Sequence, residues 1–212
     1  MKRLLLLLVV FPLIFVGCSE EEVQLPAEDI TLRYGETKQL ADNPYGGMSV
    51  NNKYIASIES GTIKGRHVGE TTAVLQDGRT VEVKVTSNVS SIKEISREWG
   101  VKRYQVINNS ELGDFYPSET SYDIWQALSA DGKILYSYNF TNGVLTSSAM
   151  AVHKSLLSEL ADFLKERFTL VDVSSIISGG YDADNIDDAK TIVGITVVNA
   201  NYYFVSFIPN EQ

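Results

Sequence analysis

The side chains that most often do chemistry in proteins are few in this chain. There is one cysteine, Cys18, and the two histidines are His67 and His153. Neither histidine has the His-x-x-x-His spacing or the cysteine neighbour that a zinc site needs, and no Gly-x-Ser-x-Gly elbow or phosphate-binding glycine loop occurs. Both histidines are expected to be structural. The sequence therefore predicts no catalytic residue, no cofactor and no enzyme.

The acidic segment that begins at Asp182 is the best place in the chain for a hard cation, because Ca²⁺ prefers several oxygen ligands at short spacing. The segment nevertheless departs from the calcium-loop pattern, since Ile186 stands at its fifth position and Val193 at its twelfth. No metal is therefore predicted. The weak candidates for metal ligands are Asp182, Asp184, Asp187 and Asp188.

A structural role for this segment is favoured over metal binding. Asp184 or Asn185 is suited to cap a short helical turn. Asp187 and Asp188 would then lie in the first turn, where carboxylates stabilise the positive end of the helix dipole. A hydrolase that uses Asp182 and Asp184 is the less favoured alternative, and it depends on whether these side chains line a cleft.

Aromatic residues could form a platform for a sugar ring or a partner protein. They alternate along two expected strands, in the sets Tyr136, Tyr138 and Phe140 and Tyr203, Val205 and Phe207. Such faces more often form the packed side of a sheet, which is the favoured interpretation here. The candidate ligand-binding residues are instead Trp125 and Tyr116, which lie near expected loops.

The N-terminus has the order of a secretory signal. Basic residues at positions 2 and 3 precede the apolar stretch 4–16, and Gly17 and Cys18 follow. Residues 4–17 are too short for a spanning helix, which needs about 20 residues. An ordinary signal peptide with an unrelated cysteine stays an alternative.

These N-terminal residues resemble the signal box of bacterial lipoproteins, in which the cysteine after a small residue is cleaved and acylated. The resemblance implies a lipid on Cys18 and anchoring to a membrane, because several acyl chains bind far more firmly than one. The acidic run 19–22 resembles the surface-export signal of Bacteroidetes lipoproteins. Residues 1–17 are thus expected to be a signal peptide, and residues 18–26 a lipidated tether on the outer membrane that faces the cell exterior. Retention in the periplasm stays open.

The charge balance excludes nucleic acid as a partner. The chain has 18 basic and 27 acidic residues, and removal of the signal with Lys2 and Arg3 leaves 16 basic residues and a net charge of −11. The remaining basic residues are scattered, whereas phosphate binding needs them clustered. With Cys18 acylated, the chain has no disulfide and no thiolate nucleophile.

Residues 27–87 read as short strands separated by turns, which is typical of a β-sandwich. Strands are expected around residues 30–32, 38–40, 54–58, 62–64, 71–75 and 81–85, with a hairpin at Asp77-Gly78. Ile-Ala-Ser-Ile (55–58), Gly-Thr-Ile-Lys-Gly (61–65), Val-Gly-Glu-Thr-Thr-Ala (68–73) and the closing Val-x-Val-x-Val strand resemble the bacterial immunoglobulin-like group 2 domain. That family's tryptophan is absent, and Met48 or Val50 is the nearest apolar residue. The resemblance implies a spacer or adhesion module.

Residues 90–212 are expected to form an α+β domain with a helix packed on an antiparallel sheet, after a small-polar linker at 86–91. Helical turns are expected near 91–95 and 101–108, and strands at 122–128, 134–140, 144–147, 168–173, 191–198 and 202–208. The main helix is expected to begin at Thr146 or Ser147. Its apolar positions are Met150, His153, Leu156, Leu157, Leu160, Phe163, Leu164 and Phe168.

The order of a helix and three strands, repeated, suggests an internal duplication and looks like small lipoproteins and secreted inhibitor domains built from that unit. The whole chain is thus expected to be a two-domain, lipid-anchored protein with a binding, adhesion or structural role toward an extracellular protein or glycan. A periplasmic inhibitor or assembly partner is the alternative.

Overall fold

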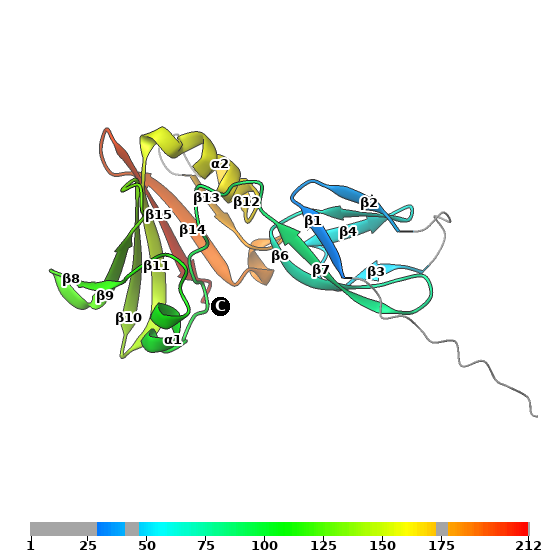
Figure 1. Ribbon diagram of the computed structural model, residues 1–212, viewed down its shortest axis with the longest axis horizontal. Coiled ribbons are helices and arrows are strands. Elements are labelled where there is room, and N and C mark those ends of the chain that lie inside the picture. The colour runs from blue at the N-terminus through cyan, green and yellow to red at the C-terminus, as the bar shows by residue number, and fades with distance from the viewer. Residues whose placement is uncertain (1–28, 41–46, 173–177, 212) are drawn as a thin grey trace, which may run out of the picture.

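The computed structural model describes residues 29–40, 47–172 and 178–211. The predicted signal peptide, Cys18 and the predicted acidic tether lie outside these residues. The described chain is mostly β, with an N-terminal β region and a larger antiparallel sheet with a helix, and the two lie side by side along the long axis of the molecule (Figure 1). None of the helices in the described ranges is long and apolar enough to cross a membrane.

The N-terminal β region holds two small sheets that share one core. The first has the order β1-β7-β6-β3 and the second β2-β5-β4. Its apolar core takes residues from both sheets, among them Leu32, Ile63 and Val83. The strands are β1 (Ile30–Arg33), β2 (Thr37–Gln39), β3 (Ser49–Val50), β4 (Ala56–Glu59), β5 (Thr62–Gly65), β6 (Gly69–Val74) and β7 (Thr80–Thr86).

The predicted strands of this region are confirmed, and so is the hairpin at Asp77-Gly78, which joins β6 to β7. Gly78 has a positive φ of 85°, as the tight turn requires. β3 was not predicted, but Val50, which the sequence offers near the missing tryptophan position, is buried in the core. β1 pairs with β7 in parallel, and the other pairs in this region are antiparallel.

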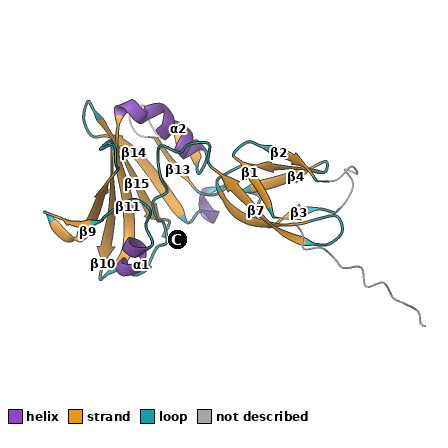
Figure 2. Cartoon of the chain, viewed as in Figure 1, coloured by secondary structure: helices purple, strands orange, loops and turns teal. Residues whose placement is uncertain are grey.

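The C-terminal region is built on an eight-stranded antiparallel sheet with the order β12-β13-β14-β15-β11-β10-β9-β8. Figure 2 shows this sheet with the helices beside it. Each helix is followed by four strands, and the two sets of four meet where β11 pairs with β15. The elements are α1 (Arg103–Asn108), β8 (Tyr116–Ser118), β9 (Ser121–Leu128), β10 (Ile134–Thr141), β11 (Val144–His153), the 3₁₀ turn η1 (Lys154–Leu156), α2 (Leu157–Lys165), β12 (Thr169–Asp172), β13 (Ser178–Tyr181), the 3₁₀ turn η2 (Ile186–Asp188), β14 (Thr191–Val197) and β15 (Tyr202–Pro209).

The start of the main helix was predicted wrongly. Residues 144–153 form the strand β11, and the helical segment begins only at Lys154. The alternate side chains of Ser148, Met150 and Val152 are buried against the core, so tertiary packing selects the strand over the helical spacing. His153 ends the strand and caps η1, since its Nδ1 accepts a hydrogen bond from Ser155 N at 3.2 Å. It is not a helical residue.

Other predictions have mixed outcomes. The helix α1, the strands β9 and β10 and the final hairpin β14–β15 are confirmed. The helical turn expected near residues 91–95 is wrong, because this segment lies extended over the sheet. Lys93 N donates to Tyr136 Oη at 3.1 Å and Ser96 N donates to Tyr138 Oη at 3.0 Å. The expected repeat is correct in order, but it contains four strands per unit instead of three, since β8 and β13 were missed.

One face of the large sheet carries the core of this region. Tyr136, Tyr138 and Phe140 are buried there, as the core interpretation predicted, and Val205 and Phe207 join them. α2, α1 and the segment around Ile92 and Ile95 all pack on this same face. The opposite face consequently has no covering layer in the described part of the chain.

Candidate functional site

Two places in the structure were tested as functional sites, the junction between the two regions and the opposite face of the large sheet. The junction is formed where the end of α2 meets the loop after β3 and the segment before β6. Val68 N donates to the carbonyl of Glu166 at 2.7 Å, and Arg66 pairs with Asp184 at 3.0 Å. Backbone and side-chain bonds therefore both cross from one region to the other.

A buried charged pair lies at the centre of the junction. Glu166 and Arg167 are 2% and 4% exposed. The Glu166 carboxylate accepts hydrogen bonds from Ser87 Oγ and from Asn88 N, the latter at 3.1 Å, and so holds the start of the linker. Arg167 pairs with Glu94 and lies 3.8 Å over the Phe163 ring. These partners satisfy charges that would otherwise be costly to bury.

The N-terminal region contributes Tyr54 and His67 to the junction. Tyr54 Oη donates to the carbonyl of Arg167 at 3.0 Å, and burial raises the pKa of Tyr54 to about 12. The His67 ring stacks on Tyr54 at 3.8 Å, and its Nδ1 lies 2.7 Å from the carbonyl of Tyr54. Burial lowers the pKa of His67, because desolvation disfavours the imidazolium form. The structural role predicted for His67 agrees with these contacts.

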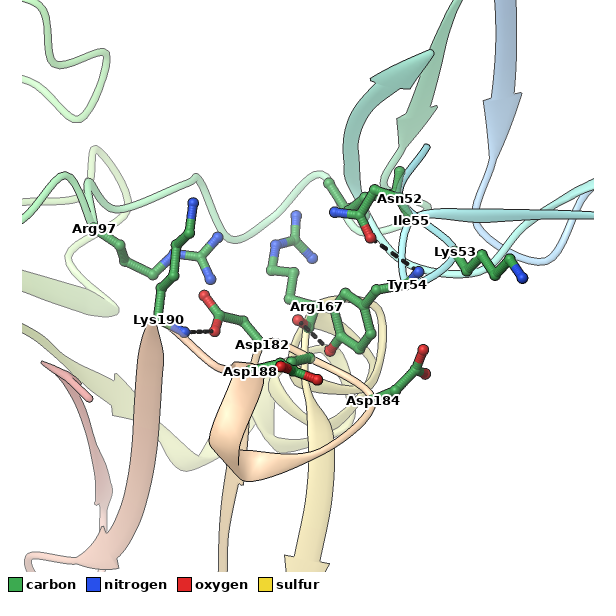
Figure 3. Close-up of a pocket in the computed structure, with 12 residues that line it drawn as sticks. Asn52, Lys53, Tyr54, Ile55, Arg97, Arg167, Asp182, Asp184, Asp188 and Lys190 are labelled. Atoms are coloured by element: carbon green, nitrogen blue, oxygen red, sulfur yellow. Dashed lines mark hydrogen bonds between the residues drawn. The ribbon is translucent and has the colours of Figure 1, made fainter. Parts of the chain in front are cut away.

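A cleft of about 380 Å³ opens at this junction (Figure 3). Tyr54 and Asn52 face it from the N-terminal region, and the acidic segment faces it from the other side. The two carboxylates that the hydrolase alternative needs, Asp182 and Asp184, do line it. A wider cleft of about 1010 Å³ runs along the linker and shares Arg97 and Arg167 with the first.

The carboxylates of the cleft are nevertheless engaged in structural bonds. Asp182 Oδ1 accepts hydrogen bonds from the backbone N of Lys190 and of Thr191, both at 2.8 Å. Asp184 pairs with Arg66, as described above. These bonds hold the loop between β13 and β14 and tie it to the N-terminal region, which favours a structural use of the cleft over catalysis.

The helix-cap interpretation of the acidic segment is confirmed at Asn185. Its Oδ1 accepts a hydrogen bond from Asp188 N at 3.0 Å, and Asp187 and Asp188 lie in the first turn of η2. Among the residues that the structure describes, no group of three or more histidine, cysteine, aspartate or glutamate side chains is arranged to hold a metal ion. Asp182, Asp184 and Asp188 each bond to a different partner: the backbone N of Lys190 and Thr191, the Arg66 guanidinium, and the Asn185 amide.

Three central rows of outward residues on the opposite side of the large sheet are here called the uncovered face. Register identifies three rows across it. Its first row is Leu128, Leu135, Ala151, Phe204 and Thr196. The middle row is Tyr116, Gln126, Ser137, Ala149, Ser206, Gly194, Gly179 and Val171. The third row contains Ile124, Asn139 and Ser147 on β9 to β11, and Ile208, Ile192, Tyr181 and Thr169 on β15 to β12.

The uncovered face has no charged residue in any of these rows, although 21% of the whole chain is charged. Large apolar side chains are exposed on it. The exposed fractions are 52% for Leu128, 38% for Phe204 and 45% for Ile208. An uncharged sheet face that exposes several large apolar side chains is a candidate site for a partner.

The two predicted binding residues lie on different faces of the sheet. Tyr116 is 49% exposed and stands at the β8 end of the middle row, opposite Gln126. Trp125 pairs with Tyr138 on the core face and is partly buried against the core. The guanidinium of Arg103 lies 5.2 Å over its ring. Tyr116 therefore belongs to the uncovered face and Trp125 does not.

Sequence reasoning missed Phe204, Ile208 and Leu128. A signal for them was present, because the residues that alternate with the core positions of β10, β11 and β15 are uncharged throughout. The solvent side of a half-buried strand is normally polar, and in this acidic chain charges are expected among its residues. Three neighbouring strands without them indicate a surface that is not simply solvated.

Comparison of the chain with protein-family models, with curated proteins and with solved structures finds no match. The function is therefore argued from the geometry of the uncovered face and the junction.

Proposed function

We propose that this chain is a lipid-anchored protein of the cell envelope with a binding or structural role and no catalytic one, and that the uncovered face is its binding surface. The observation that carries the proposal is the absence of charge on that face together with the exposure of Leu128, Phe204 and Ile208. The core elements all pack on the other side, so the sheet is kept ordered without a cover on this one.

The N-terminal β region serves as the support, and we assign it to the bacterial immunoglobulin-like group 2 type. Two of the glycines in the resemblance stand where a larger residue does not fit. A Cβ on Gly65 would lie 2.8 Å from the carbonyl of Arg33, and a Cβ on Gly69 would lie 2.6 Å from Ile55 Cδ1. The bonds of Glu166 and Tyr54 then hold the support and the large sheet in one orientation.

The anchor is argued from the sequence of residues 1–22. Acylation of Cys18 and the acidic run after it favour attachment to the outer membrane with the folded part facing the cell exterior. There the uncharged face suits an extracellular protein or an uncharged glycan better than an anionic polymer, because an acidic chain repels negative charge.

A periplasmic inhibitor or assembly partner is the second candidate. It is favoured by the repeated order of a helix and strands, the sequence feature that looks like the secreted inhibitor domains named above, although each unit has four strands and not the three expected. This candidate uses the same uncovered face, and it differs in the side of the outer membrane on which the partner is found.

A photo-crosslinking residue placed at Phe204, with a matched placement at Leu157, tests the binding surface in intact cells. Leu157 is 45% exposed at the start of α2 and lies away from the uncovered face. We expect crosslinked products from position 204 and none from 157. Equal yields at the two positions would refute the assignment of the surface.

The anchor is tested by a Cys18→Ser variant, which should lose both the fatty-acid label and its place in the membrane fraction. Protease treatment of intact cells separates the two candidates, because only a surface protein is digested.

A further inference from the structure

We propose that the partner on the uncovered face is a second copy of this chain, so that the anchored protein is a parallel dimer. The inference rests on the proposed function, in which this face is a binding surface, and it names the occupant. Four features of the described residues support it, namely the charge of the face, the symmetry of its rows, its area and its direction.

If two copies of the chain contact each other, the distribution of charge favours contact through this face over contact through the rest of the surface. The chain carries a net charge of −9, so two copies repel each other where their acidic surfaces meet. The rows of the uncovered face contain no aspartate, glutamate, lysine or arginine. Two copies can therefore bring these faces together without burying a charge or opposing like charges.

The arrangement of the rows allows a two-fold symmetric contact. The middle row is small at its centre, where Ser137, Ala149 and Ser206 stand, and the rows on either side carry larger residues such as Phe204 and Ile208. A two-fold axis along the middle row turns the first row of one copy onto the third row of the other. Phe204 then packs near Ile208 of the second copy, and the small residues of the middle row meet their own equivalents, as an isologous contact requires.

The area is sufficient for a dimer. Strands lie about 4.8 Å apart and rise about 3.3 Å per residue, so five strands of about seven residues present about 550 Å² each. Two copies bury about 1,100 Å², which is at the lower limit for a specific interface, about 1,000 Å². The expected affinity is therefore modest, but attachment of both copies to one membrane raises their effective concentration.

The direction of the middle row allows both copies to be anchored in the same membrane. The row ends at Val171 and Gly179 on β12 and β13, beside the junction, and begins at Tyr116 on β8, the strand farthest from the N-terminal region (Figure 1). An axis along this row leaves both N-terminal regions at the same end of the dimer. Both copies of β1, the first described strand, then lie at that same end.

The experiment is cysteine crosslinking of the full-length chain in its own membrane. In an Ala149→Cys variant, oxidation should give a disulfide-linked product of twice the chain mass, because residue 149 faces its equivalent across the axis. The parent chain, which has only Cys18, and a Leu157→Cys variant on the exposed side of α2 are the controls, and neither should form this product.

Two further substitutions test whether the uncovered face makes the contact. Phe204→Lys or Ile208→Lys in the Ala149→Cys chain should lower the yield of the product by about tenfold or more, since each introduces an unpaired charge into the apolar contact. Leu157→Lys should leave the yield unchanged, and Leu157 is as exposed as Ile208, at 45%. Circular dichroism of the purified variants verifies that they fold.

The inference is overturned if Ala149→Cys crosslinks no more than Leu157→Cys, or if the lysine substitutions leave the yield unchanged. The proposed function is tested separately from the dimer. Photo-crosslinking from position 204 to a different protein, with no product of twice the chain mass, would retain the binding surface and reject the second copy. If neither crosslinked product forms, both the binding surface and the second copy are rejected.

Discussion

At the junction, burial shifts the pKa of two side chains, raising that of Tyr54 and lowering that of His67. His67 is the clearest case, since it stacks on Tyr54 in a partly buried position and has a lowered pKa. A neutral ring is needed there, and protonation of the folded state is resisted by desolvation. The unfolded chain has no such restraint.

As the pH falls, protonation of His67 should therefore lower the stability of the fold. In the unfolded chain this histidine takes up a proton near its ordinary pKa of about 6.5, whereas the folded chain does so only at lower pH. The stabilisation is complete above the ordinary pKa and is lost as the pH falls toward the lowered folded value. The free energy of unfolding is measured by denaturant at pH 7.5 and at pH 5.5. Between these two pH values it should change less for His67→Gln than for the parent. A His67→Gln chain that loses as much stability as the parent between these two pH values would contradict the assignment.

At the scale of elements, a glycine allows the strands β12 and β13 to pair closely. β13 has the sequence Ser-Gly-Gly-Tyr, and its two glycines have low strand propensity. The structure explains their use, because a Cβ on Gly180 would lie 2.7 Å from the carbonyl of Thr169 on the neighbouring strand. The close approach of β12 and β13 therefore depends on the absence of a side chain.

Gly180→Ala should consequently destabilise the fold by about 1–3 kcal/mol, the usual range for overpacking. Denaturant unfolding measures the effect. Gly47→Ala is the matched control, because no atom lies within 4 Å of its added Cβ. A Gly180→Ala chain as stable as the parent would mean that β12 and β13 can separate without loss.

The same elements show how far local sequence reasoning extends. Alternation with a clear turn, as around Asp131-Gly132 between β9 and β10, was enough to predict both strands. The β11 to α2 boundary was not predictable from spacing alone. Met150 fits a helical stripe with Leu157 and also an alternating stripe with Val152, and only contact with β10 and β15 selects the strand.

The candidate site was predictable only in part, for a related reason. The cap at Asn185 depends on neighbours within three residues and was foreseen. The uncovered face depends on which side of the sheet the helices cover, and that choice is made by contacts between residues far apart, such as Ile92 with Tyr136 in one core. Tyr116 was named, but Phe204 and Ile208 were not.

For the whole molecule, the buried pair at the end of α2 determines whether the two regions act as one body. Glu166 holds the linker through Ser87 and Asn88, and Arg167 is the acceptor for Tyr54 through its carbonyl. Loss of the Glu166 carboxylate leaves the buried Arg167 guanidinium with Glu94 as its remaining carboxylate partner among the residues that the structure describes. Removing one partner of a buried pair typically costs about 3–5 kcal/mol.

Glu166→Ala should therefore release the linker as well as lower stability. Limited proteolysis of the full chain should cut between residues 86 and 91 faster than in the parent, and small-angle scattering should give a larger radius of gyration. Asp162→Ala, on the exposed side of the same helix, is the control and should change neither. Unchanged cleavage in Glu166→Ala would show that Val68 and Tyr54 hold the junction without it.

The parallel pairing of β1 with β7 also has a mechanical consequence. The four paired positions run from Ile30 and Val83 to Arg33 and Thr86, so a pull applied before β1 and after β7 acts along the strands in opposite senses. Such a load stretches all the hydrogen bonds between the two strands together, in shear, and cannot unzip them one after another. A chain tethered at its beginning and dragged by flow or by a neighbouring cell would yield at this pair only under high force.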